Sequence, residues 1–110
     1  MLGSIRRSFG GQVAATPPHE VSVRVRGGYD PDTIRAVAGV PLRIIFRREE
    51  SAPCSEQVVF PAFGKSASLP PGKNVTVDLL PEEPGEYEFT CGHGMLRGTL
   101  VVVPLGALFP

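Results

Sequence analysis

The strongest constraint on the fold is a two-residue alternation of apolar and polar side chains that returns along most of the chain. Val21, Val23 and Val25 alternate with polar residues, and residues 74 to 79 repeat the pattern. Successive side chains of a strand point to opposite faces, so this period predicts strands with one buried face. No stretch shows a helical period with capping signals. Further short strands are expected over residues 34–37, 42–46, 57–60, 86–90 and 98–103.

Clusters of glycine and proline separate these segments, among them residues 27–32, 70–73 and 81–85. Turn signals recurring roughly every eight to twelve residues between short strands are typical of two packed sheets. A chain of 110 residues is long enough to bury the core of a single domain. The expected fold class is therefore all-β, a Greek-key antiparallel β-sandwich of seven to eight strands.

The two ends of the chain differ from this pattern. Residues 1–18 are small, polar and basic, and they hold no apolar run long enough for a signal peptide or a membrane span. Arg6 and Arg7 resemble a twin-arginine signal, but the apolar segment that should follow is missing. We expect a flexible leader over 1–18, a folded domain over 19–104 and a C-terminal tail over 105–110.

The charge pattern limits the classes of molecule that the protein is expected to bind. Eleven Lys and Arg residues balance eleven Asp and Glu residues, and the charges are scattered along the chain. Neither a nucleic acid nor an anionic membrane surface fits that balance. The charged run Arg47-Arg48-Glu49-Glu50 is interpreted as a solvated loop. The protein is expected to be a monomer, with no membrane-spanning segment in this chain.

Catalytic motifs are missing from the sequence. It has no nucleophile elbow, no phosphate-binding loop and no HExxH zinc helix. A Cys91–His93 nucleophile pair is conceivable, but both residues lie in one tight turn without a third group to orient them. The chain is therefore not expected to be an enzyme.

The most specific chemical signal is Cys91-Gly92-His93-Gly94-Met95. Thiolate, imidazole and thioether together form a donor set that selects copper over hard cations. Glycines at 92 and 94 allow a positive φ, so the backbone can fold tightly enough for alternate side chains to converge. Because Cys91 continues the inward series of the strand before it, its sulfur is expected to point into the end of the sandwich.

Each of these residues has a second interpretation. Cys54, the other cysteine, and Cys91 could form a disulfide, share a metal ion, or do both under different redox conditions. Met95 could fill the end of the core in place of binding a metal. His93 could be a ligand or an unengaged side chain facing solvent.

Together with their surroundings, these residues resemble the cupredoxins, and more closely the small cupredoxin-like domains found alone or fused to bacterial copper-transport proteins. The resemblance spans residues 20 to 103, nearly the whole expected domain. The matching stretches are Gly27-Gly28-Tyr29-Asp30-Pro31, Cys54 with Val58-Val59-Phe60-Pro61, Leu69-Pro70-Pro71-Gly72, and residues 84–98 from Pro84 to Gly98.

The resemblance implies a copper site at one end of the sandwich. Cys91 matches the cysteine of blue-copper proteins, His93 the second histidine and Met95 the methionine, while Cys54 stands where the first histidine would be. That thiol and the short spacing of the loop depart from the blue-copper pattern. Two thiolates favour Cu(I), because Cu(II) tends to oxidise such a pair.

The expected function is therefore copper handling, as a chaperone, a store or an accessory domain of a copper transporter. The partner would be a copper donor or acceptor protein, with the cell envelope favoured and the cytoplasm possible. The alternatives are a type-1-like electron-transfer cupredoxin and a metal-free structural domain with a Cys54–Cys91 disulfide. Zinc in a Cys2His site is a further candidate.

Overall fold

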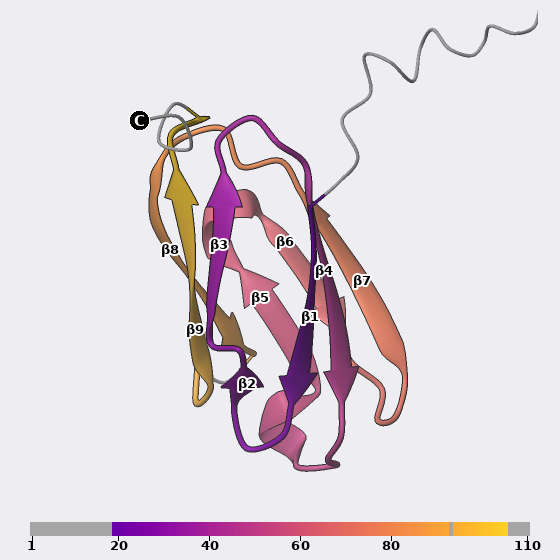
Figure 1. Ribbon diagram of the computed structural model, residues 1–110. Coiled ribbons are helices and arrows are strands. Elements are labelled where there is room, and N and C mark those ends of the chain that lie inside the picture. Colours follow the sequence, from indigo (N-terminus) through magenta and orange to yellow (C-terminus); the bar gives the residue numbers. More distant parts are fainter. Residues whose placement is uncertain (1–18, 93, 106–110) are drawn as a thin grey trace, which may run out of the picture.

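Two β-sheets packed face to face make up the protein in a computed structural model that describes residues 19–92 and 94–105 (Figure 1). The all-β sandwich expected from the sequence is confirmed, and within the described residues the only helical elements are short 3₁₀ turns. The elements are β1 (His19–Val25), β2 (Tyr29–Asp30), β3 (Thr33–Val37), β4 (Leu42–Arg48), η2 (Pro53–Ser55), β5 (Gln57–Phe60), η3 (Pro61–Phe63), β6 (Lys65–Ser68), β7 (Asn74–Leu79), β8 (Gly85–Cys91) and β9 (Arg97–Val103).

Both sheets are mixed. One sheet has the strand order β2-β1-β4-β7 and the other the order β3-β9-β8-β5-β6. β1 pairs with β4 in parallel, as β3 does with β9, and the other pairings are antiparallel. The parallel pairs arise because the chain leaves the first sheet after β2, forms β3 in the second, and returns as β4.

The sequence predicted seven of the nine strands found in the described residues. The two that it missed are β2, which has only two residues, and β6, whose Lys-Ser-Ala-Ser sequence has no apolar alternation. Both owe their conformation to a neighbouring strand, β1 for the first and β5 for the second.

An aromatic cluster fills the core between the sheets. Phe46, Phe60 and Phe89 are fully buried, and Tyr29 is buried beside them. The rings of Tyr29 and Phe89 are 4.9 Å apart, and those of Phe60 and Phe89 are 5.1 Å apart, measured between centroids. Burying each phenylalanine contributes roughly 1.5–3 kcal/mol. Phe89 and Cys91 lie two residues apart on β8 and are both buried, so their side chains point to the same inner face of the sheet.

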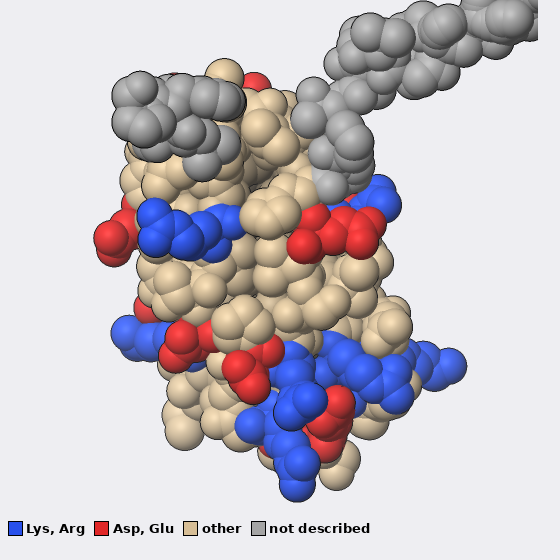
Figure 2. Space-filling model, viewed as in Figure 1, with Lys and Arg blue, Asp and Glu red and all other residues tan. Residues whose placement is uncertain are grey.

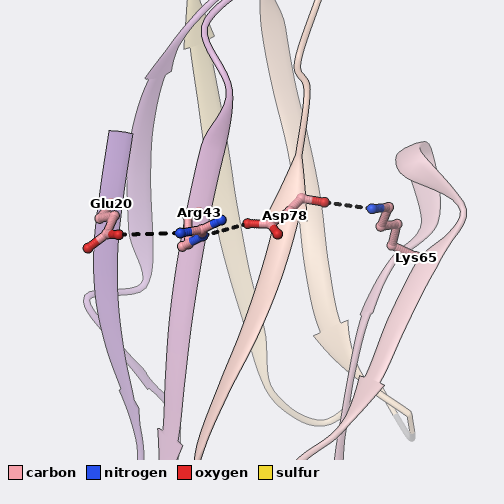
Figure 3. A network of polar contacts seen from close by, with 4 residues as sticks. All are labelled: Glu20, Arg43, Lys65 and Asp78. Carbon is pink, nitrogen blue, oxygen red and sulfur yellow. Dashed lines mark hydrogen bonds and ion pairs between the residues drawn. The ribbon is translucent and has the colours of Figure 1, made fainter. Parts of the chain in front are cut away.

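A polar network crosses the outer face of the first sheet (Figure 3). Arg43 on β4 donates from Nε to Asp78 Oδ1 of β7 at 2.9 Å, and its Nη1 lies 3.7 Å from Glu20 Oε2 of β1. Lys65 Nζ of β6 donates to the Asp78 carbonyl at 2.7 Å, which links the edges of the two sheets. These groups are exposed, so their ion pairs add little to the fold.

On the face shown in Figure 2, both signs of charge occur, and blue side chains gather in the lower part with red ones among them. Among the described residues no helix is long and apolar enough to cross a membrane.

Candidate metal centre

Cys91 lies at the end of β8 and is buried, with 1% of its surface exposed. The inward orientation expected from the sequence is therefore confirmed. Its Sγ accepts two backbone N–H groups, from Met95 at 3.2 Å and from Leu96 at 3.4 Å. Donors aimed at a sulfur stabilise its negatively charged form, and the thiolate is the form that binds metal ions.

The backbone of the turn after Cys91 supports this geometry. Gly94 N–H donates to the Cys91 carbonyl at 3.0 Å, and Cys91 N–H donates to the Leu96 carbonyl at 3.1 Å. Gly94 has φ of 73°, the left-handed conformation that the sequence suggested. A Cβ at Gly92 would come within 2.5 Å of Gln57 Oε1, which is the far end of a flexible side chain, and Gly92 does not have a positive φ. Its expected role in supplying a positive φ is therefore wrong.

Cys54 lies in η2 and is half-buried. η2 immediately precedes β5, and β5 pairs antiparallel with β8 through Val58 and Cys91. The start of β5 and the end of β8 consequently lie at one end of the sandwich, the lower end in Figure 1. The topology thus brings the two cysteines to the same end, and they are not joined by a disulfide.

Arg48 holds the segment that carries Cys54. It lies at the end of β4 and is 5% exposed. Its Nε donates to Ser55 Oγ at 2.9 Å, Nη2 to the Ala52 carbonyl at 2.7 Å and Nη1 to the Leu69 carbonyl at 2.8 Å. Two of these bonds straddle Cys54 in the chain, so the guanidinium fixes the turn on both sides of the thiol.

Tyr29 reaches the same region from β2. Its hydroxyl is buried and has no hydrogen-bond partner within the described part of the chain. Burial raises the pKa of Tyr29 above its ordinary value, and negative charge on Cys91 and then on Cys54 raises it further. The hydroxyl is therefore a neutral donor at physiological pH.

The remaining expected ligands are placed differently. The side chain of Met95 is 74% exposed, so it does not fill the core, and that interpretation of Met95 is wrong. His93 lies outside the described residues, as do the leader 1–18 and the tail from 106 to 110. Residues 19–92 and 94–105 contain no group of three His, Cys, Asp or Glu side chains able to hold a metal.

Two residues of this region were missed from the sequence. Arg48 was assigned to a solvated loop with its charged neighbours, and the structure corrects this because its side chain is buried. The available signal was parity: Arg48 continues the inward series of Leu42, Ile44 and Phe46. For Tyr29, nothing in the sequence indicated that its hydroxyl is buried without a hydrogen-bond partner in the described part of the chain.

The comparisons with known proteins agree with this architecture. The model of the cupredoxin-like domain family matches residues 6–102. A copper-binding protein solved by NMR in the apo form is 41% identical, and its alignment covers 81% of this chain and 92% of that protein with a TM-score of 0.75. No curated protein sequence matches the chain.

Two further solved structures are similar. The metal-binding domain of the Cu(I)-exporting P-type ATPase CopA of Streptococcus pneumoniae D39, solved with Cu(I), is 27% identical; the alignment covers 76% of this chain and 84% of that domain, with a TM-score of 0.75. Auracyanin B is 19% identical over 82% of this chain and 92% of its own, with a TM-score of 0.66, and shares the fold. The chain belongs to the cupredoxin-like domain family.

Proposed function

We propose that the protein binds one Cu(I) ion at the lower end of the sandwich through Cys54 and Cys91. Met95, His93 or both complete the coordination. The protein handles copper as a chaperone, a store or an accessory domain of a copper transporter. Its partners are the proteins that give and take the ion, and we place this exchange at the cell envelope.

The observation that carries the proposal is the arrangement of the Cys54 and Cys91 sulfurs. They come from separate loops that the β5–β8 pairing brings to one end, and they are not joined to each other. The buried Cys91 Sγ already accepts two backbone N–H groups, which is how a fold prepares a thiolate. Soft thiolate and thioether donors suit Cu(I) better than hard divalent ions.

The exposure of Met95 supports a handling role over storage alone. A thioether that is three-quarters exposed at the edge of the site can reach an ion that arrives from solvent or from another protein. Two similar proteins support copper as the ion, since one is a copper-binding protein and the other a Cu(I) exporter domain solved with Cu(I).

An anaerobic titration of the reduced protein with Cu(I), repeated in competition with Zn(II), tests the proposal. We expect one equivalent of Cu(I) to bind, to give a colourless adduct and to raise the melting temperature, because only the folded chain brings the two thiols together. A melting curve that does not respond to Cu(I) would refute the site. A coloured Cu(II) form that bleaches reversibly would support electron transfer, and stronger binding of Zn(II) would favour a zinc site.

A further inference from the structure

The Tyr29 hydroxyl is buried among aromatic rings. Tyr29 is 6% exposed, and its ring packs against Phe46 and Phe89, with centroids 6.1 Å and 4.9 Å away. Within residues 19–92 and 94–105 the hydroxyl has no hydrogen-bond partner. An unpaired buried hydroxyl costs free energy, and phenylalanine would fill the same space without that cost. The hydroxyl is therefore a donor that the described part of the fold does not use.

Glu50 Oε2 is the other buried side-chain oxygen without a partner in the same residues. Glu50 lines a surface cavity together with the buried Arg48, so its negative charge shares that cavity with a cation. A nearby guanidinium stabilises a carboxylate even without a direct hydrogen bond. The two rings that pack on Tyr29 offer no such charge, so its hydroxyl needs a different explanation.

Tyr29 lies at the end of the sandwich that holds the two cysteines. β2 pairs with the last residues of β1 and lies at the lower end in Figure 1. The Tyr29 ring contacts the ring of Phe89, and Phe89 precedes Cys91 by two residues on the same inner face of β8. In addition to burial, negative charge on Cys91 and then on Cys54 raises the pKa of Tyr29. The hydroxyl stays neutral at physiological pH, so toward a thiolate it can act only as a donor.

A further donor to Cys91 would matter most when copper is bound. Cu(I) with two thiolates carries one net negative charge, and hydrogen bonds to a thiolate stabilise its charged form. The Cys91 Sγ already accepts the N–H groups of Met95 and Leu96, both from its own turn. Tyr29 belongs to the first sheet and Cys91 to the second, so a bond between them would also join the two sheets at the site. Groups that hydrogen-bond to metal ligands tune the affinity of a site.

We propose that the Tyr29 hydroxyl donates a hydrogen bond to the Cys91 thiolate when Cu(I) is bound, and that this bond strengthens copper binding. This role rests on the proposed Cu(I) function and adds to it a residue from the opposite sheet. Tyr29 acts through Cys91, so it is a positioning residue and not a ligand. In the metal-free protein the same hydroxyl lowers the stability of the fold, because it is buried without a partner.

The test replaces each of the two tyrosines of the chain by phenylalanine, which removes only a hydroxyl. Tyr87→Phe is the matched control, because the Tyr87 hydroxyl donates to the Glu83 carbonyl at 2.7 Å. The Cu(I) affinity of the reduced full chain is measured anaerobically against a colorimetric chelator, and melting is measured without metal. The chain has no tryptophan, so the intrinsic emission of Tyr87→Phe reports on Tyr29 alone.

We expect Tyr29→Phe to lower the Cu(I) affinity about tenfold and to leave the metal-free melting temperature unchanged or raised. Tyr87→Phe should do the reverse, lowering the melting temperature and keeping the Cu(I) affinity of the parent. Adding Cu(I) to Tyr87→Phe should quench the emission of Tyr29, since its hydroxyl proton is then shared with an anionic sulfur. The emission of Tyr87 in Tyr29→Phe should not respond to Cu(I).

An unchanged Cu(I) affinity in Tyr29→Phe, with a parent that binds Cu(I), would overturn this inference alone. A parent that binds no Cu(I) would overturn the proposed function together with it. A loss of metal-free stability in Tyr29→Phe equal to that in Tyr87→Phe would show that the hydroxyl serves the fold, and would overturn its role at the site. If Tyr29→Phe no longer lowers the affinity in a His93→Ala background, the acceptor is the imidazole, and the assignment to the Cys91 thiolate is wrong.

Discussion

The two cysteine segments of the lower end are held in different ways. In the Cys91 turn, the sulfur is supported by the backbone of residues four and five positions later, within a turn closed by Gly94. In the Cys54 turn, the support comes from Arg48 on β4, whose guanidinium also bonds to the distant Leu69 carbonyl. The Cys91 thiol is therefore held by backbone groups close to it in the sequence, and the Cys54 turn by a side chain from a distant strand.

Because of this difference, the two halves of the site depend on different structural features. The Cys91 turn depends on backbone conformation and on the β8–β9 pairing that it closes. The Cys54 turn depends on one buried side chain, Arg48, which reaches it from the end of β4. Four predictions separate these two forms of support.

The largest effect is expected for Gly98→Ala, which tests the support of the Cys91 turn. Gly98 pairs with Phe89, and the Phe89 ring occupies the space that a Cβ at 98 would need. Overpacking there should lower the free energy of unfolding by about 3 kcal/mol, measured by chemical denaturation. Thiol labelling of the folded protein should become faster at Cys91 and stay the same at Cys54. Equal acceleration at both thiols would show that the two segments are not independent.

The next effect concerns the ligands themselves. Cys54→Ser and Cys91→Ser should each weaken Cu(I) binding at least about tenfold more than Met95→Leu or His93→Ala, a difference of roughly 1.4 kcal/mol. Thiolates offset the charge of the ion, whereas the thioether and the imidazole are neutral. Met95→Leu nearly conserves volume and serves as the control. If Cys54→Ser binds Cu(I) like the parent while His93→Ala abolishes binding, the site belongs to the Cys91 turn alone.

Ser55→Ala tests the support of the Cys54 turn. It leaves the Arg48 Nε–H buried without its acceptor, which should lower the free energy of unfolding by about 1 kcal/mol. Labelling of Cys54 should become faster while labelling of Cys91 does not. Ser51→Ala is the matched control, since Ser51 is exposed in the same loop. A similar change in both serine variants would argue against a role of the Arg48 hydrogen bonds in holding the Cys54 turn.

The smallest effect is expected for Gly94→Ala. A Cβ at 94 meets no atom within 4 Å, so the cost is backbone strain at φ of 73°, about 1 kcal/mol. Gly39→Ala, at φ of 84° in an equally open turn at the opposite end, should cost the same. Only Gly94→Ala should weaken Cu(I) binding, by about threefold, because it moves the N–H donors at Cys91. Equal copper affinities in the two variants would show that the turn does not prepare the thiolate.

Much of the fold could be predicted because alternation is a local property. The apolar residues of β7 and β4 showed their buried faces directly in the sequence, and the order of short strands and turns indicated a sandwich. The mixed pairing of the sheets could not be predicted in this way. Parallel pairing of β1 with β4 depends on where the chain crosses between sheets, and no local pattern records that crossing.

At the candidate site, too, some features follow from local sequence and others only from the tertiary structure. By itself the sequence determined the donor types, the burial of Cys91 and the positive φ at Gly94, because strand parity and glycine chemistry act over a few residues. The tertiary structure decided that Arg48 is buried, that Met95 is exposed and that Cys54 shares an end with Cys91. Those outcomes depend on which distant segments displace water around a side chain, and that is settled only when the two sheets pack.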